Sequence, residues 1–351
     1  MRSAGSSARL ALASIFYFGV CLSLGQLALG QAPGAGRTFP QPAPAREVTI
    51  TAIPGVIDAG AKWKLVFQNA NNSDGIAGSP DGGLLFAQEQ LSQINKLDKN
   101  DKFSVFLTDG HGVGAVAIGP KGRILAVERT CTDPGAKPDE CKEPTDIGEL
   151  LSATGRTPMR KILADSFNGK GLGRINDLVA AKNGGVYFTS GAAYYLSPEG
   201  KVSMIGENLR TNGIMLSRDE KTLYVTNGPV IVAFDIQADG SVKNQREFGK
   251  LEGGGNGDGS AIDAEGRLYV STAPGVQVLS PEGKYLGLIP TPRNAISVAF
   301  SGPGKKTLYL VGNGGVGPDG KEITTPAGVR NTAMTIYKIP MLAQGFKGRA
   351  K

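Results

Sequence analysis

One ten-residue pattern occurs six times in this sequence and leaves few folds open to it. Each copy joins a turn of Gly, Asp, Asn or Lys to an apolar segment rich in strand-forming residues. The copies are SPDGGLLFAQ from residue 79, GPKGRILAVE from 119, AKNGGVYFTS from 181, SRDEKTLYVT from 217, DAEGRLYVST from 263 and GPGKKTLYLV from 302. A period of roughly 36 to 62 residues with this composition is typical of blades of antiparallel sheet. We therefore predict an all-β protein, a six-bladed β-propeller.

A mostly polar position lies five residues before each repeat. These ring positions are Asp74, Gly114, Asn176, Asn212, Asp258 and Ser297. Blades related by rotation about one axis place equivalent positions at the same height, so we expect these side chains to converge near one mouth of the central channel. A single Asp-Gly or Asn-Gly pair usually marks only a turn. Several such pairs at the same distance from their repeats favour a functional site instead.

The segments between the repeats are expected to supply the outer strands, for example over residues 93–97 and 230–235. A strand over residues 333–339 should pair with the segment around residues 48–53 and close the ring, which removes exposed sheet edges. Residues 129–172 form an insertion longer than a blade needs and return to the ring just before Asn176. We expect this insertion either to cover the mouth or to be a surface excursion.

The N-terminal segment has the features of an export signal. Basic residues precede an apolar stretch, and a small-residue pattern precedes Gln31. We expect residues 1–30 to be a signal peptide, with an uncleaved membrane anchor as the alternative. Residues 31–46 are rich in Pro, Ala and Gly, which predicts a flexible spacer before a propeller over residues 47–351. The protein is accordingly expected in the periplasm or outside the cell.

Two cysteines remain after signal removal, and both lie in the insertion. An even pair in an exported chain predicts a disulfide between Cys131 and Cys141. A metal site is the alternative, but it would need further thiols or imidazoles, and the whole chain contains 1 His.

The charge balance does not indicate a charged macromolecular partner. The chain has 38 Lys and Arg against 31 Asp and Glu, without a basic run interleaved with aromatic residues. Nucleic-acid binding is therefore not expected. No membrane contact is expected beyond the signal peptide or its alternative as an anchor, and the expected partner is a small-molecule substrate.

The ring positions carry oxygen donors, which hard cations prefer. Asp74, Asn212 and Asp258 would hold one divalent cation, with Ca²⁺ favoured and Mg²⁺, Mn²⁺ or Zn²⁺ as alternatives. Asn176 would complete this shell or face a substrate. A serine nucleophile is not indicated, because the chain has no G-x-S-x-G motif.

Three segments, residues 173–189, 211–227 and 257–292, resemble the family of gluconolactonases, senescence marker protein 30 (regucalcin) and luciferin-regenerating enzyme. The resemblance extends over most of the chain after the N-terminal segment. It implies a six-bladed propeller with one divalent metal in the central channel.

By that resemblance, Asn212 and Asp258 match the family's metal-binding Asn and Asp, and Asp258 also matches the proposed base. Arg174 and Asn176 match the family's substrate-contacting Arg and Asn. The chain departs from the family at Asp74, which stands in Asp-Gly-Ile where the family usually has Glu-Gly-Pro. The first metal ligand is therefore one methylene shorter.

These residues predict a lactone hydrolysis in which the cation polarises the carbonyl while Asp258 accepts a proton from the attacking water. Arg174 and Asn176 would bind the substrate, although an inter-blade salt bridge is the alternative role for Arg174. His111 precedes Gly114 by three residues and could reach the mouth as a third substrate-binding side chain. A structural or solvent-facing imidazole is its alternative.

The function predicted from the sequence is that of an exported, Ca²⁺-dependent hydrolase of small lactones or sugar lactones, a carboxylic ester hydrolase. The main alternative is a non-catalytic propeller that binds a small ligand or a protein on its top face, because a fold does not by itself imply an activity. A different chemistry on the same scaffold, such as a strictosidine-synthase-like condensation or a phosphotriester hydrolysis, is a third hypothesis.

Overall fold

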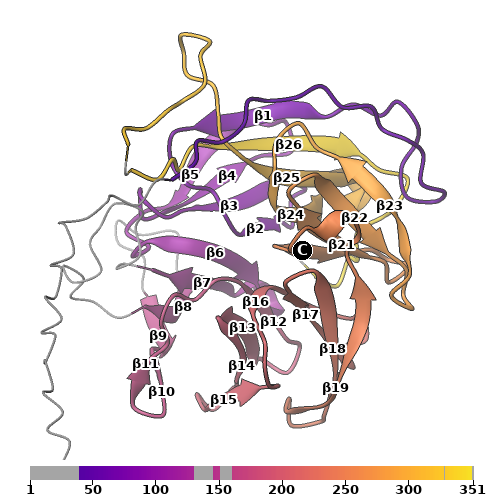
Figure 1. The fold of residues 1–351 in the computed structure, drawn as a ribbon. Coiled ribbons are helices and arrows are strands. Elements are labelled where there is room, and N and C mark those ends of the chain that lie inside the picture. The colour runs from indigo at the N-terminus through magenta and orange to yellow at the C-terminus, as the bar shows by residue number, and fades with distance from the viewer. Residues whose placement is uncertain (1–38, 130–144, 151–159, 328, 350–351) are drawn as a thin grey trace, which may run out of the picture. The chain divides into compact units, whose positions relative to one another are not determined.

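Six four-stranded antiparallel sheets make up the described part of the chain in the computed structural model (Figure 1). The structure describes residues 39–129, 145–150 and 160–349, except residue 328. These residues belong to one unit that runs from Thr38 to Lys351. The predicted all-β, six-bladed β-propeller is confirmed.

Each blade is numbered by its place along the chain, and its strands are given from the inside outward. Blade one contains β2 (Ile76–Gly78), β3 (Leu84–Gln88), β4 (Gln93–Leu97) and β5 (Phe103–Leu107). Blade two contains β6 (Val113–Ile118), β7 (Ile124–Glu128), β8 (Asp146–Leu150) and β9 (Arg160–Ala164). Blade three contains β12 (Leu178–Ala180), β13 (Val186–Ser190), β14 (Ala192–Leu196) and β15 (Val202–Ile205).

The other three blades follow the same order. Blade four contains β16 (Thr211–Leu216), β17 (Thr222–Asn227), β18 (Val230–Ile236) and β19 (Val242–Lys250). Blade five contains β20 (Ser260–Ile262), β21 (Leu268–Thr272), β22 (Gly275–Leu279) and β23 (Tyr285–Pro290). Blade six contains β24 (Ala295–Ser301), β25 (Thr307–Asn313), β26 (Met334–Pro340) and β1 (Lys64–Asn69). The connections between these strands contain one further hairpin, formed by β10 (Ser166–Phe167) and β11 (Lys170–Gly171). They also contain three short 3₁₀ helices, which are η1 (Pro120–Gly122), η3 (Glu252–Gly254) and η4 (Pro303–Lys305).

The apolar part of each repeat is the second strand of a blade, and burial on both of its faces explains its composition. Successive side chains of a strand point to opposite faces. In β3, Leu84 and Phe86 pack between blades six and one, whereas Leu85 and Ala87 pack between blades one and two. A strand buried on both faces reads as a continuous apolar segment rather than an alternating one.

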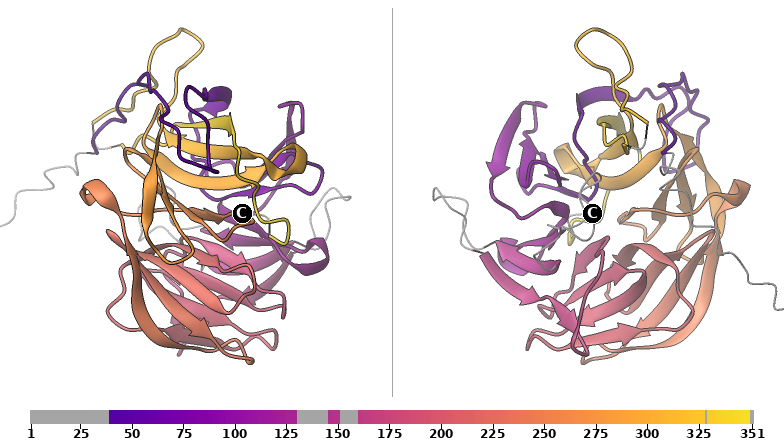
Figure 2. Two further views of the ribbon diagram at one scale, coloured as in Figure 1. Left: turned by 90° about the vertical axis from the view of Figure 1, so that its right-hand side faces the viewer. Right: turned by 60° about the vertical axis from the view of Figure 1, so that its left-hand side comes forward.

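The inner strands form a closed ring. β2, β6, β12, β16, β20 and β24 each contact the next in that order, and β24 contacts β2. Figures 1 and 2 show the sheets arranged around a common centre, and the labelled strands β2, β12, β16 and β24 lie toward that centre in Figure 1. The apolar core is accordingly divided into six clusters, one in each gap between neighbouring blades.

The strand that closes the ring differs from the one predicted. β26 pairs with β1, and Asn69 of β1 lies opposite Met334 of β26. Residues 48–53 form no strand. The expectation of a pairing with residues 48–53 was wrong because the apolar pattern of that segment serves packing instead. Ile50 and Ile53 are buried in the cluster between blades five and six.

The expected insertion at residues 129–172 contains half of a blade. β8 and β9 lie within it and complete blade two, which corrects the expectation of an excursion beyond the blade. Cys131 and Cys141 lie outside the described residues, so their disulfide stays a prediction. Residues 130–144 and 151–159 of the insertion also lie outside the described residues, so the cover expected from residues 129–172 stays a prediction.

The start of the propeller unit also differs from the prediction. Residues 39–46, expected to be part of a flexible spacer, lie against blades five and six. The Arg46 guanidinium donates to the carbonyl oxygens of Thr291 (2.9 Å) and Ala273 (3.1 Å). The folded unit therefore begins before Glu47. In the described part of the chain, no helix is long and apolar enough to span a bilayer, and the predicted signal peptide at residues 1–30 lies outside that part.

Candidate functional site

The ring positions lie next to one another at one end of the channel, where the inner strands begin. The Gly75 N–H, beside Asp74, donates to the Gly114 carbonyl oxygen (3.0 Å). Asn176 Nδ2 donates to Asn212 Oδ1 (2.8 Å). Further round the ring, the Gly259 N–H, which follows Asp258, donates to the Ile296 carbonyl oxygen (2.9 Å), next to Ser297. Each of these three hydrogen bonds joins the ring ends of two neighbouring blades.

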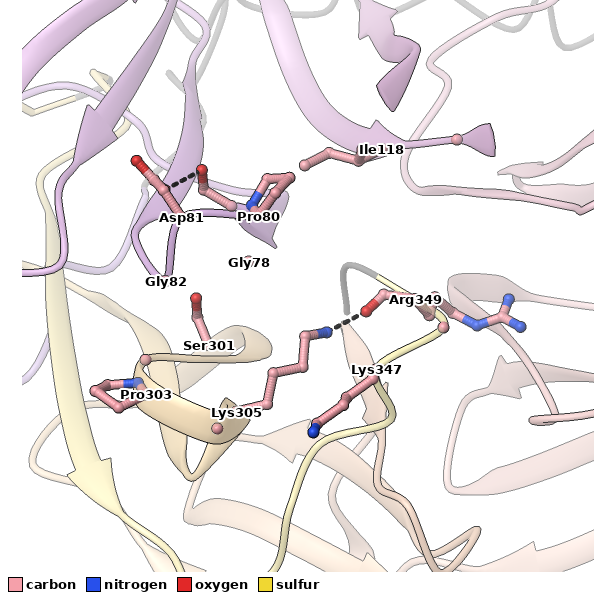
Figure 3. Close-up of a pocket in the computed structure, with 15 residues that line it drawn as sticks. Gly78, Pro80, Asp81, Gly82, Ile118, Ser301, Pro303, Lys305, Lys347 and Arg349 are labelled. Atoms are coloured by element: carbon pink, nitrogen blue, oxygen red, sulfur yellow. Dashed lines mark hydrogen bonds between the residues drawn. The ribbon is translucent and has the colours of Figure 1, made fainter. Parts of the chain in front are cut away.

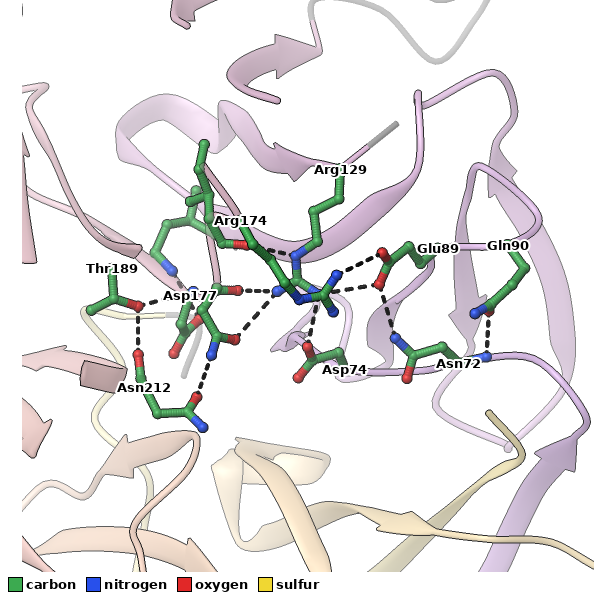
Figure 4. A network of polar contacts seen from close by, with 12 residues as sticks. Asn72, Asp74, Glu89, Gln90, Arg129, Arg174, Asp177, Thr189 and Asn212 are labelled. Carbon is green, nitrogen blue, oxygen red and sulfur yellow. Dashed lines mark hydrogen bonds and ion pairs between the residues drawn. The ribbon is translucent and has the colours of Figure 1, made fainter. Parts of the chain in front are cut away.

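Arg129 is the first of two residues of this site that the sequence analysis missed. It follows β7, and its side chain is 0% exposed. Its Nη1 pairs with Asp74 Oδ2 (3.0 Å), and its Nη2 donates to Asn176 Oδ1 (3.3 Å) and to the Asn176 carbonyl oxygen. Its Nε donates to the Ile175 carbonyl oxygen (2.6 Å). One guanidinium therefore links blades one, two and three (Figure 4).

Glu89 is the second missed residue, and it ties the network to the channel mouth. The carboxylate is buried, with Oε2 accepting from Arg129 Nη1 (3.2 Å) and from Asn72 Nδ2 (3.1 Å). Oε1 pairs with Arg174 Nη1 (3.2 Å). Glu89 and Arg129 each directly follow a repeat, in blades one and two, so the phase argument used for the ring positions would have found this pair of opposite charges.

Arg174 is the most open of the charged groups in this network. Its side chain is 39% exposed, and it lies two residues before Asn176 in the sequence. Burial, followed by the nearby positive charge of Arg129, lowers the pKa of Arg174. The predicted salt-bridge alternative and the predicted substrate role are compatible, since a guanidinium has five N–H donors.

The Asn176 and Asn212 carboxamides are held in place by the strands that carry them. Thr189 of β13 donates through Oγ1 to the Asn212 carbonyl oxygen, and the Asn176 N–H donates to the Thr189 carbonyl oxygen (2.7 Å). Both carboxamides are half-buried. These contacts hold the backbone, and each carboxamide oxygen also accepts a hydrogen bond, Asn176 Oδ1 from Arg129 Nη2 (3.3 Å) and Asn212 Oδ1 from Asn176 Nδ2 (2.8 Å).

Asp258 carries the most perturbed carboxyl group of the ring. Its backbone N–H donates to the Ser271 carbonyl oxygen (2.9 Å), which fixes its place at the start of blade five. Burial, followed by the negative charges of Asp74 and Asp177, holds the pKa of Asp258 well above its ordinary value. The Asp258 side chain still has a partly accessible surface, but surrounding protein atoms remove most of its hydration.

His111 and Gly114 occupy blade two's part of the ring end. His111 is half-buried with a φ of 48°, in the turn between β5 and β6. The next carbonyl oxygen, that of Gly112, accepts from the Arg129 N–H (2.9 Å), so this turn lies beside the network. The substrate-binding role of His111 stays a prediction.

A cavity of about 580 Å³ lies away from these residues. It is lined by turns of blades six, one and two and by residues 347–349. Gly78, Ile118 and Ser301 in its wall are the ends of inner strands, so it lies at the opposite end from the ring positions (Figure 3). Lys305 there donates to the carbonyl oxygens of Phe346 and Arg349 and holds the C-terminal segment. The carboxylates and carboxamides thus identify the candidate site better than cavity size does.

A model of the SMP-30/gluconolactonase/LRE-like region matches residues 91–313. The chain belongs to this family. The gluconolactonase of Zymomonas mobilis is 26% identical to it over 303 residues, which cover 74% of this chain and 81% of that protein.

Solved structures of the family share the fold. A gluconolactonase from Xanthomonas campestris superposes with a TM-score of 0.64 at 21% identity and covers 88% of this chain and 98% of its own. Regucalcin from Agrobacterium tumefaciens, a calcium-binding protein, has a TM-score of 0.62 at 16% identity and covers 81% of this chain and 95% of its own. At these identities the likeness supports the fold alone.

Family membership raises the question of a divalent cation, and the residues present fit one. Within the described ranges, no three His, Cys, Asp or Glu side chains form a metal-binding cluster, so a cation would depend on a carboxamide oxygen as well as on two carboxylates. The site has four carboxyl groups and two guanidinium groups, so its net charge is −2 when all six groups are ionised. The carboxyl groups are those of Asp74, Glu89, Asp177 and Asp258, and the guanidinium groups are those of Arg129 and Arg174. This net negative charge, together with the oxygen donors, suits one hard divalent cation.

Proposed function

We propose that this protein is a divalent-cation-dependent lactone hydrolase. The observation that carries the proposal is the arrangement of Asp74, Asn212 and Asp258 around one end of the channel, with Arg174 and Asn176 beside them. The gluconolactonase relative from Zymomonas mobilis supports the reaction class. The shared fold with other gluconolactonases supports the scaffold.

Asp74, Asn212 and Asp258 would hold the cation, and Ca²⁺ is the ion we propose. All three donors are oxygens, which Ca²⁺ prefers over nitrogen or sulfur. When bound, such a cation polarises a lactone carbonyl oxygen and stabilises the negative charge that develops on it. The calcium-binding regucalcin with the same fold agrees with this choice.

Asp258 is the proposed base. Its carboxylate would take a proton from a water molecule as the water oxygen bonds to the carbonyl carbon, and the bond from that carbon to the ring oxygen would then break. The same proton returns to the departing ring oxygen, so one water is consumed and a hydroxy acid is formed. Arg174 and Asn176 would hold substrate oxygens through charge-assisted and neutral hydrogen bonds.

A panel of small lactones tests this proposal, with hydrolysis followed by proton release. The purified protein should hydrolyse at least one sugar lactone, lose turnover on addition of a chelator and recover it with Ca²⁺ in preference to Mg²⁺, Mn²⁺ or Zn²⁺. A folded protein that hydrolyses none of them with any of these ions would instead support a binding propeller without catalysis.

We also propose that the protein is exported and that Cys131 and Cys141 are joined. The N-terminal sequence pattern and the even cysteine pair support this. Fractionation of cells that express the full chain should place the protein outside the cytoplasm with a mature N-terminus near Gln31. Thiol labelling without reductant should leave Cys131 and Cys141 unmodified, and labelling of both would contradict the disulfide.

A further inference from the structure

Arg129 is built into the site but cannot touch a substrate. Its side chain is fully buried, so any effect it has on the reaction must pass through the residues that it contacts. We infer that Arg129 is a positioning residue that holds Asp74 and Asn176 in their working places. This inference rests on the proposed function and assigns a further residue to that site.

Arg129 contacts two residues of the candidate site at the same time. Nη1 pairs with Asp74 Oδ2 at 3.0 Å, and Nη2 reaches Asn176 through its side-chain oxygen (3.3 Å) and its carbonyl oxygen. A planar guanidinium fixes the relative positions of its acceptors because its donors have fixed directions. Asp74, in blade one, and Asn176, in blade three, are thus set relative to each other by a side chain from blade two.

Gly114 explains how Arg129 reaches this place. A Cβ atom added at Gly114 would lie 2.3 Å from Arg129 Cζ and 2.3 Å from Nε, closer than non-bonded atoms approach. The ring position of blade two is therefore filled by the guanidinium of Arg129 in place of a side chain of its own. This accounts for the single ring position without a side chain.

Glu89 secures the opposite side of the guanidinium. Its Oε2 accepts from Arg129 Nη1 (3.2 Å), and its Oε1 pairs with Arg174 (3.2 Å). Asp74 consequently shares Arg129 with a second carboxylate and keeps one oxygen, Oδ1, for another partner. A carboxylate can serve a guanidinium and a cation through its two oxygens.

Removal of Arg129 would take away the buried guanidinium that Asp74 and Glu89 share, and the protein could fail to fold. Gly114→Ala offers a milder test, because it displaces the guanidinium while every charged and polar side chain is kept. Gly171→Ala is the matched control, since a Cβ at Gly171 has nothing within 4 Å. Gly171 lies in the β10–β11 hairpin and contributes no contact to the network.

The experiment compares the full chain with both variants in calorimetric Ca²⁺ titration, lactone hydrolysis and thermal unfolding. Gly114→Ala should bind Ca²⁺ about tenfold more weakly and lose about ten- to a hundredfold in kcat, with a smaller change in KM, as expected for misplaced groups. Gly171→Ala should match the wild type in all three. Arg129→Lys should also bind Ca²⁺ more weakly than the wild type, because an ammonium keeps the positive charge but lacks the fixed fork of donors that reaches Asp74 and Asn176 together.

A Gly114→Ala protein with wild-type Ca²⁺ affinity and wild-type kcat would overturn the inference. Equal losses in Gly171→Ala would also overturn it, because they would show a general effect of the added methyl group. If the wild type binds Ca²⁺ but hydrolyses no lactone, the proposed function fails, while the affinity ratio between wild type and Gly114→Ala still decides the role of Arg129.

Discussion

Burial, followed by repulsion from Asp74, disfavours a negative charge on Asp258 of the ring. Burial and the charge of Asp74 raise the pKa of Asp258, which means that a second negative charge is costly there. Arg129 compensates Asp74 only in part, because it also pairs with Glu89. A bound divalent cation would remove the remaining cost, and this gives the site its expected affinity.

At the residue scale, Asp74→Asn should weaken Ca²⁺ binding by at least about tenfold, since the site loses one of two carboxylate donors. Calorimetric titration of the purified protein measures this directly. Asp81→Asn is the control, because Asp81 lies at the other end of the channel and pairs with Lys96. Equal affinities for wild type and Asp74→Asn would show that Asp74 is not a ligand.

At the scale of single elements, blade two contains a pair of like charges. Glu128 of β7 lies opposite Asp146 of β8, and both accept hydrogen bonds from Arg160. Burial, followed by the nearby Asp146, raises the pKa of Glu128 to about 8. The folded protein therefore binds a proton at Glu128 that the unfolded chain, with an ordinary Glu, has lost above about pH 4.5.

The stabilising contribution of protonated Glu128 is thus complete below the unfolded pKa and is lost as the pH rises to about 8. Glu128→Gln should flatten the fall in Tm between about pH 5 and about pH 8, which calorimetry at several pH values measures. Glu149→Gln is the control on β8, because Arg123 lowers the pKa of Glu149 and its titration lies below this window. An unchanged slope in Glu128→Gln would contradict the assignment.

The second strand of every blade could be predicted from the sequence because burial on both faces makes it apolar throughout. The closing strand could not be identified, since β1 is KLVFQN, a half-exposed segment outside the repeat, while residues 48–53 have the more strand-like alternation. The ring positions followed from their phase. Arg129 was missed because the phase argument was applied only to the positions ahead of each repeat and not to the position directly after it. Its contact with the ring depends in addition on a long side chain that reaches the place left by Gly114, which a strand pattern does not encode.

At the scale of the whole molecule, ring closure couples all six blades. The β1–β26 pairing joins the two ends of the propeller unit, and the clusters in the gaps pack each blade against two neighbours. Loss of packing in one gap should therefore lower the stability of the whole ring. Unfolding is expected as one transition.

Ile336→Ala tests this coupling in the gap where the ring closes. Ile336 of β26 is fully buried, and its truncation should cost about 2–5 kcal/mol while thermal unfolding stays a single transition. Leu65→Ala on the neighbouring β1 is the control, with a side chain 46% exposed and an expected change within about 1 kcal/mol. Two separate transitions in Ile336→Ala would show that the blades unfold independently.

The most direct measurement of the central claim is hydrolysis of a small lactone by wild type and Asp258→Asn, side by side at saturating Ca²⁺. Asp258→Asn keeps the size of the side chain and relieves its repulsion with Asp74, so the variant should stay folded. Turnover should fall by at least about 10³-fold, because a carboxamide cannot accept the proton of the attacking water. Undiminished hydrolysis by folded Asp258→Asn would contradict the proposed mechanism.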